Sequence, residues 1–337
     1  MKDAPIVVIG TSRGGLQALR DILGALPSDF AAPILVAMHI GAYDSELPAL
    51  LASACALPVR HAVDDETLQP GTVLIAPPDK HLMIDSGKIR LIRGAKENYS
   101  RPAIDPLFRS AALSHRAQVI GMVLTGDLDD GTVGLQAIKA CGGVALVQDP
   151  ADAIAPSMPS SALRHVNIDG CLSLPRLCER LVMLVRQSGA TLRKSLEPNP
   201  IMAMENQISL NAGMAHMGDL DRLVPRSSLT CPECHGALWE MGQRPLRYRC
   251  HTGHTFTELS MRASQDTSIE ELLWSAVRAL HEKQALMIRH QEVFDGTGRT
   301  EAAVEYAQIA QTAAAHAHSL VALIESLHVH GMKQSAE

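Results

Sequence analysis

Short apolar runs alternate with amphipathic stretches over residues 1–190. Four of the runs are rich in β-branched and aliphatic residues and have the length of buried strands: 6–9, 34–38, 119–124 and 144–147. Apolar residues at helical spacing follow the first and third of these runs, over 16–26 and 132–140. The alternation predicts an α/β domain, 1–190, with a doubly wound and mostly parallel sheet.

Residues 57–100 interrupt this alternation with closely spaced turn signals. Gln69-Pro70-Gly71, Pro77-Pro78-Asp79 and Asp85-Ser86-Gly87 separate short apolar runs. Such spacing favours hairpins over helical crossovers, so we expect an antiparallel insertion in the parallel sheet.

The pattern changes after residue 190. Residues 191–228 show little periodicity and are rich in Pro, Asn, Met and Ser, which indicates a linker. A Cys/His cluster occupies 229–258, and two stretches of helical periodicity, separated by Asp295-Gly296-Thr297-Gly298, occupy 266–330. We therefore expect a small zinc-ribbon-like module followed by an αα-hairpin.

Composition and charge restrict the class of protein. The chain has 337 residues, 20% of them charged, with a net charge of -6, which disfavours nucleic-acid binding. No run approaches the roughly 18 apolar residues of a membrane span, so we expect no membrane insertion. The N-terminus leads directly into a strand without a signal peptide, and the seven cysteines are scattered. We expect a cytoplasmic protein.

Three residues able to carry out chemistry follow three of the predicted strands: Ser12, His39 and Asp130. The carboxyl ends of parallel strands meet at one edge of a sheet, so these side chains can converge there. Ser12 lies in a glycine-rich turn before a helix whose N-terminal N–H groups suit a developing oxyanion. His39 could accept the proton of Ser12, and Asp130 could orient the imidazole.

Each of these residues also fits a simpler structural or ligand-binding role. A glycine-rich turn after a first strand also suits a phosphate or nucleotide, although the spacing Gly-x-Gly-x-x-Gly is lacking. A histidine at a strand end is commonly structural, and Asp130 could cap a helix. From the spacing alone, a serine hydrolase and a phosphate- or nucleotide-binding fold remain equal alternatives.

A set of motifs in a fixed order extends this pattern: Gly10-Thr11-Ser12-Arg13-Gly14-Gly15, Met38-His39, Ala76-Pro77-Pro78-Asp79-Lys80-His81, Arg101-Pro102-Ala103-Ile104-Asp105-Pro106, Thr125-Gly126-Asp127-Leu128-Asp129-Asp130-Gly131 and Ser157-Met158-Pro159. Together they resemble the catalytic domain of the chemotaxis protein-glutamate methylesterase (CheB) family. The resemblance covers residues 5 to about 187 of the chain.

The resemblance implies a serine hydrolase that removes γ-glutamyl methyl esters from chemoreceptors, releases methanol and, in some members, deamidates glutamine. Ser12 is then the nucleophile, His39 the base and Asp130 the orienting acid. The oxyanion would rest on the backbone N–H groups of Arg13 and Asp127. No cofactor is expected for catalysis.

Two further residues, His81 and Arg101, lie in motifs that line the cleft of the family. We treat them as supporting residues, with a structural role as an equal alternative.

The chain departs from the family pattern beside the nucleophile. Arg13 replaces a small hydroxyl residue and Asp127 replaces a methionine. A carboxylate at Asp127 would repel a developing oxyanion unless it is paired, and we expect an ion pair with Arg13 at the rim of the cleft.

The start of the chain is a second departure. Only five residues precede the first predicted strand, so we expect no receiver domain in this chain. Control would then come from a receiver-domain protein in trans or from the C-terminal part.

The Cys/His cluster has the spacing of a metal site. Cys231 and Cys234 form a Cys-x-x-Cys pair, and Cys250 and His254 follow after 15 intervening residues. Three thiolates and one imidazole match a structural zinc site, with His235 and His251 as competing ligands. A redox Cys-x-x-Cys pair is the alternative, although no thioredoxin-like βα unit follows it.

The second function class is a non-catalytic signalling adaptor, in which the C-terminal module binds a partner. The presence of Ser12, His39 and Asp130 together favours the esterase, whose substrate would be a methylated chemoreceptor or another methylated signalling protein.

Overall fold

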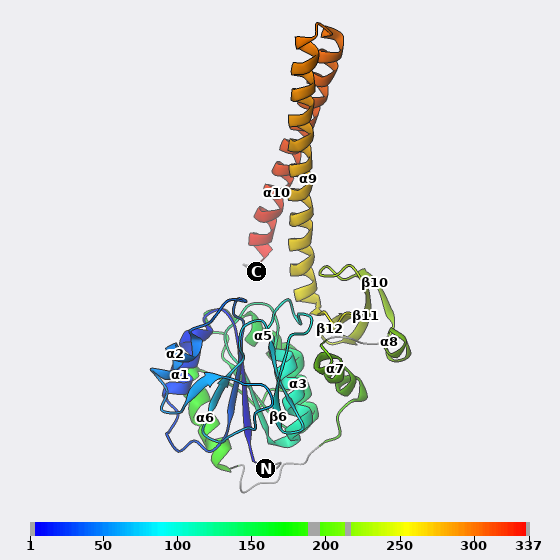
Figure 1. The fold of residues 1–337 in the computed structure, drawn as a ribbon. Coiled ribbons are helices and arrows are strands. Elements are labelled where there is room, and N and C mark those ends of the chain that lie inside the picture. The colour runs from blue at the N-terminus through cyan, green and yellow to red at the C-terminus, as the bar shows by residue number, and fades with distance from the viewer. Residues whose placement is uncertain (1–3, 188–195, 213–216, 335–337) are drawn as a thin grey trace. The chain divides into compact units, whose positions relative to one another are not determined.

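The computed structural model describes residues 4–187, 196–212 and 217–334. The chain divides into two compact units, one up to Arg262 and one from Ala263 onward. Most of the first unit is built on one seven-stranded sheet (Figure 1), in which every neighbouring pair of strands is parallel. In sheet order the strands are β3 (Val59–His61), β4 (Val73–Ile75), β2 (Ile34–Met38), β1 (Ile6–Thr11), β7 (Val119–Val123), β8 (Val144–Gln148) and β9 (Gly170–Leu172).

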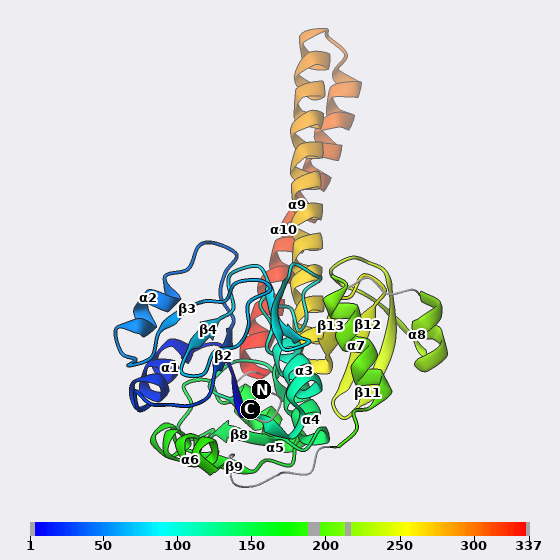
Figure 2. The same ribbon diagram turned by 60° about the horizontal axis from the view of Figure 1, so that its bottom comes forward.

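Helices cover both faces of this sheet, which confirms the doubly wound α/β fold (Figure 2). One face packs against α1 (Gly15–Gly24), α2 (Leu47–Ala52) and α6 (Leu174–Gln187). The other packs against α3 (Ile104–His115), α4 (Thr132–Ala140) and α5 (Ser157–His165), and a short 3-10 helix, Arg116–Gln118, precedes β7.

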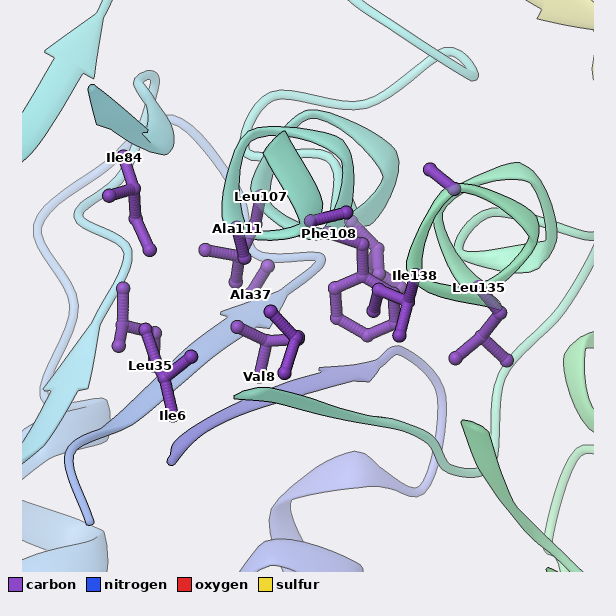
Figure 3. Packing of buried hydrophobic residues seen from close by; sticks show 14 of the residues in the cluster. Ile6, Val8, Leu35, Ala37, Ile84, Leu107, Phe108, Ala111, Leu135 and Ile138 are labelled. Atoms are coloured by element: carbon purple, nitrogen blue, oxygen red, sulfur yellow. The ribbon is translucent and has the colours of Figure 1, made fainter. Parts of the chain in front are cut away.

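The side chains of β1 alternate between these two cores. Val8 lies in the core under α3, close to Phe108 (Figure 3), whereas Val7 and Ile9 lie in the opposite core. All of them are inaccessible to solvent, as a central parallel strand requires.

The insertion is smaller than the sequence suggests. Within 57–100 only β5 (His81–Asp85) and β6 (Lys88–Ile92) are antiparallel, as a separate pair. Strands β3 and β4 instead extend the parallel sheet beside β2. The short, fully buried β4 can pair with a central strand, so it joins the sheet in spite of the turn signals around it.

The interval 191–228, where we expected a linker, contains two helices, α7 (Pro200–Leu210) and α8 (Met217–Leu223). Asn199 caps α7 by accepting a hydrogen bond from the N–H of Ile201, and Pro200 occupies the first turn. These are start signals for a helix. The two helices share an apolar cluster with the strands that follow: Ile208, Leu220, Val224, Trp239 and Met241.

The cysteine-rich segment is a four-stranded antiparallel sheet, here called the ribbon: β10 (Arg226–Thr230), β11 (Ala237–Gln243), β12 (Leu246–Cys250) and β13 (Thr255–Thr257). Its small core combines Leu238, Tyr248 and Phe256 with two buried cysteines, Cys231 and Cys250.

Two long helices make up the remaining chain, α9 (Glu258–Gly296) and α10 (Thr300–Gln334), which run antiparallel. The hairpin begins before the expected residue 266, because Thr257 caps α9 by accepting a hydrogen bond from the N–H of Ser260. A row of small and aliphatic residues lies between the helices: Val277, Ala303, Ala310, Ala317 and Ile324. In the described part of the chain, no helix is long and apolar enough to cross a membrane.

Candidate active site

The three strand-end residues lie where the order of the sheet reverses. Strand β1 pairs with β2 on one side and with β7 on the other, and these strands precede Ser12, His39 and Asp130. Such a switch point is the usual ligand-binding crevice of an open parallel sheet. The topology therefore brings together three residues that are up to 118 positions apart in the sequence.

The turn that carries Ser12 is fixed to the end of β7. The N–H of Ser12 donates to the carbonyl of Thr125 at 3.0 Å, and the hydroxyl of Thr125 donates to the carbonyl of Arg13 at 2.9 Å. Gly14 has a φ of 80°, in the left-handed region that favours glycine. At Gly126 an added Cβ would lie 2.9 Å from the Cβ of Ser12, so only glycine permits this approach.

Ser12, His39 and Asp130 form a hydrogen-bonded chain. Nδ1 of His39 lies 3.1 Å from Oγ of Ser12, and Nε2 lies 2.7 Å from Oδ2 of Asp130. A carboxylate only accepts hydrogen bonds, so the proton of the neutral imidazole belongs on Nε2. Nδ1 then faces Ser12 as an acceptor, which is the tautomer that a general base requires.

Asp130 is buried but surrounded by donors. Besides His39, it accepts from the N–H groups of Ile104 (2.7 Å), Asp105 (3.1 Å) and Gly131 (2.9 Å). Burial is the largest single effect and raises the pKa of Asp130, but the bonds and the attraction of His39 outweigh it and lower that pKa overall. Asp130 is therefore an ionised partner for an imidazolium.

Two residues of this site were missed by the sequence reasoning, Asn98 and Asp105. Nδ2 of Asn98 lies 2.7 Å from an oxygen of Asp130 and 2.7 Å from an oxygen of Asp105. Burial, and then the charge of Asp130, raise the pKa of Asp105 well above its usual range. No spacing rule identifies Asn98, because it lies in an irregular segment with a left-handed φ of 50°.

The predicted ion pair beside the nucleophile is present. The guanidinium of Arg13 makes two contacts of 2.7 Å with the carboxylate of Asp127, and both side chains are exposed. Within the described residues, neither backbone N–H of this pair has a hydrogen-bond acceptor, so both remain available to a substrate. An open groove beside Ser12 and His39 is bordered by Arg13, Arg20 and Met38.

We expect Arg13→Ala to lower kcat/KM by about fivefold, because it leaves the charge of Asp127 unpaired near the developing oxyanion. The double variant with Asp127→Met should recover the loss, since it removes that charge as well. Measurements of kcat/KM at low and high salt would check this, and the defect should shrink as salt screens the carboxylate. An unchanged rate for Arg13→Ala would refute the role of the pair.

His81 and Arg101 lie in the supporting structure. The buried His81 accepts from the N–H of Ala103 at Nδ1 and donates from Nε2 to the carbonyl of Ala95. Burial lowers the pKa of His81, in agreement with a neutral ring. Arg101 donates to the carboxylate of Asp79 and to the carbonyl of Gly94. In the described structure neither residue is hydrogen-bonded to Ser12, His39 or Asp130.

The four predicted metal ligands converge in the ribbon. The ligand atoms of Cys231, Cys234, Cys250 and His254 all lie within 4.8 Å of one another. Nδ1 of His254 lies 3.7 Å from Sγ of Cys231 and 3.5 Å from Sγ of Cys250, and Sγ of Cys234 lies 3.7 Å from Sγ of Cys250. His251 and His235 are not members of this cluster. It can therefore hold a metal ion.

A parallel α/β fold with a serine–histidine–aspartate chain at its switch point is the arrangement of a serine hydrolase. The sequence model of the CheB methylesterase family matches residues 7–181, just over half of the chain. The chain therefore belongs to the CheB methylesterase family.

Individual relatives agree with this assignment. A Leptospira interrogans protein is 40% identical over 180 residues, which are 53% of this chain and 93% of the relative. The protein-glutamate methylesterase/protein-glutamine glutaminase of Trichodesmium erythraeum is 37% identical over 52% of this chain and 52% of its own. The crystal structure of the Thermotoga maritima CheB methylesterase catalytic domain matches with 35% identity and a TM-score of 0.52, covering 54% of this chain and 98% of that one.

Proposed function

We propose that this protein is a serine esterase that hydrolyses γ-glutamyl methyl esters on chemoreceptors or related signalling proteins and releases methanol. The observation that carries the proposal is the hydrogen-bonded chain of Ser12, His39 and Asp130 at the switch point of a CheB fold. Relatives named protein-glutamate methylesterase/protein-glutamine glutaminase support it.

Acylation begins at Ser12. Its Oγ attacks the ester carbonyl carbon while Nδ1 of His39 takes the hydroxyl proton. The tetrahedral intermediate collapses, the C–O bond to the methoxy group breaks, and His39 returns the proton to the departing oxygen as methanol leaves. Asp130, which stays ionised, stabilises the imidazolium in both halves of this step.

Deacylation uses the same groups. His39 removes a proton from water, the hydroxide attacks the acyl carbon, and the proton returns to Oγ of Ser12 as the glutamate carboxylate leaves. With a glutamine side chain the same sequence releases ammonia, which accounts for the glutaminase activity in the relatives' name. The free N–H groups of Arg13 and Asp127 are our candidates for holding the oxyanion.

The proposal is tested with a chemoreceptor cytoplasmic fragment carrying radioactive methyl esters. The full chain should release volatile radioactive methanol, and each methyl lost should appear as one new glutamate by mass spectrometry. A fragment whose methylated glutamates are replaced by alanine is the matched control. Retention of all the methyl groups by the receptor would refute the proposal.

We also propose that the ribbon cluster holds a structural zinc ion. A tetrahedron with ~2.3 Å Zn–S bonds and ~2.1 Å Zn–N bonds has edges of about 3.6–3.8 Å. Three of the six pairs of cluster atoms are 3.5–3.7 Å apart, which agrees with these edges, and all six pairs lie within 4.8 Å. Four protein ligands leave no open position, so the metal would stabilise the ribbon and take no part in the ester chemistry.

We expect the purified protein to contain one zinc per chain and Cys231→Ser to lose it. The variant should also unfold at a temperature lower by at least about 5 °C, since structural zinc contributes several kcal/mol to folding. Atomic emission and thermal unfolding measure these quantities. Cys171→Ser, at an exposed cysteine outside the cluster, is the control and should keep its zinc. A zinc-free wild type would refute the site.

The remaining expectations concern organisation and control. We propose that residues 1–190 are the catalytic domain, with 229–258 as the ribbon and the hairpin beyond it. A cytoplasmic location, which the expected substrate requires, and a receiver-domain partner in trans stay predictions. The adaptor alternative has no support from the relatives.

A further inference from the structure

The last strand of the ribbon is paired with the loop that supports the catalytic acid. The N–H of Asn98 donates to the carbonyl of Thr255 at 2.8 Å, and the N–H of Thr255 donates to the carbonyl of Lys96 at 3.3 Å. Thr255 is also bridged to Glu97. Strand β13 therefore provides the backbone partner of segment 96–98.

This pairing fixes a residue that contacts Asp130 directly. Asn98 is buried with a φ of 50°, in the left-handed region that asparagine adopts more readily than most residues. Its amide nitrogen has two hydrogens, and they are used on Asp130 and Asp105. Displacement of Thr255 would release the backbone of Asn98 and, with it, the donor to Asp130.

A second connection runs from the same strand to the residue before Asp130. Oγ1 of Thr257 donates to Oδ1 of Asp129 at 2.7 Å, and Thr257 has no exposed surface. Asp129 is also buried, and burial raises its pKa to about 6; the hydrogen bond from Thr257 is the largest effect that lowers this pKa, and the charge of Asp130 adds to the increase. The hydroxyl of Thr257 is therefore the side-chain donor that holds this carboxyl in place.

Buried ion pairs fix the ribbon to the same loop. Glu97 contacts Arg109 of α3 at 3.0 Å and Arg249 of β12 at 3.1 Å, and all three are buried. The two guanidinium groups lower the pKa of Glu97 to about 2 in spite of its burial. Separation of β12 from the loop would leave charges buried without their partners, which is strongly unfavourable.

We infer that strand β13 is a positioning element of the esterase site, in which Thr255 and Thr257 hold Asn98 and Asp129 and so fix the carboxylate of Asp130. The inference rests on the proposed function and extends it to a part of the chain beyond the family match, which ends at residue 181. Thr257 acts through Asp129 and is a positioning residue.

The test compares two variants of Thr257 in the full chain. Thr257→Val keeps the shape of the side chain but removes the hydroxyl, which both donates to Asp129 and caps α9, whereas Thr257→Ser keeps the hydroxyl. We expect Thr257→Val to lower kcat for methanol release by about tenfold with KM unchanged. The variant should misorient the base His39 without removing a contact to the substrate. Thr257→Ser should recover kcat to within about twofold.

A second measurement separates this inference from the esterase proposal. The proton on Nε2 of His39, which faces Asp130 at 2.7 Å, should give a downfield NMR resonance that can be recorded without substrate. It should shift or broaden in Thr257→Val and return in Thr257→Ser. Thermal unfolding of both variants confirms that the folded protein is compared. A wild-type kcat and an unshifted resonance in folded Thr257→Val would overturn the inference, whereas absence of methanol release from the wild type would overturn only the proposed function.

Discussion

Replacement of Ser12 by alanine should reduce the rate of methanol release by a factor between about 10⁴ and about 10⁵. The variant lacks the oxygen that forms the acyl-enzyme, so His39 and the oxyanion donors can act only on water, which leaves a small residual rate. The fold should be unaffected, because the bonds that hold the turn come from the backbone of Ser12 and from Thr125. Release of radioactive methanol under single-turnover conditions measures the loss.

The control for this variant is Ser53→Ala. The hydroxyl of Ser53 donates to the carbonyl of Leu50 at an exposed position at the end of α2. It should retain the wild-type rate. If folded Ser12→Ala kept its rate to within tenfold, the nucleophile would have to be a different residue, and the proposed chemistry would be wrong.

Asp130→Asn should lower kcat by about 10⁴-fold, because it favours the tautomer of His39 that cannot act as a base toward Ser12. Each oxygen of Asp130 accepts from at least two donors, so an amide nitrogen in either position faces donors. With that nitrogen toward His39, Nε2 must accept and Nδ1 must carry the proton. Nδ1 is the atom that faces Ser12, and once protonated it cannot take the hydroxyl proton. Rates of methanol release at neutral pH would show the loss.

A double variant of Ser12 and Asp130 distinguishes a changed tautomer of His39 from a general disturbance of the fold. Residues that act as one unit are not additive, so Ser12→Ala with Asp130→Asn should be no slower than Ser12→Ala alone. A further loss in the double variant, or a kcat for Asp130→Asn within tenfold of the wild type, would contradict the assigned role.

The positions of the three central residues could be predicted because they depend on simple rules. Buried apolar runs define parallel strands, and the carboxyl ends of neighbouring strands meet. Ser12, His39 and Asp130 each follow such a run, so the sheet alone brings them together. The ion pair of Arg13 and Asp127 could be predicted for a related reason, since a carboxylate beside a developing oxyanion needs compensation.

The contacts that hold these residues could not be predicted. Asn98 lies in an irregular segment, and its neighbours are fixed by pairing with a strand more than 150 positions away. His81 lies in a motif associated with the cleft, yet its two hydrogen bonds are to backbone groups. Local periodicity contains no information about such long-range packing.

In the ribbon, too, some features of the site could be predicted from the sequence and others could not. The Cys-x-x-Cys spacing identifies Cys231 and Cys234 as neighbours, because a tight turn brings the two thiols together. The spacing from Cys250 also predicted His254 rather than His251, and His254 is the histidine of the cluster. The second turn shows how the chain brings it there, because Gly253 has a φ of 106° and the N–H of Cys250 donates to the carbonyl of His254. A sequence pattern does not fix that geometry.

The contact between Glu97 and Arg249 has a consequence for synthesis of the chain. The two residues are 152 positions apart, so Arg249 is added about 8–30 s after Glu97 at the usual ~5–20 residues per second. Until then, Glu97 has Arg109 but not Arg249 as a charged partner, and Asn98 lacks the strand that holds its backbone. If β13 positions the site as inferred, we expect the emerging esterase domain to gain its complete catalytic geometry only after the ribbon has left the ribosome.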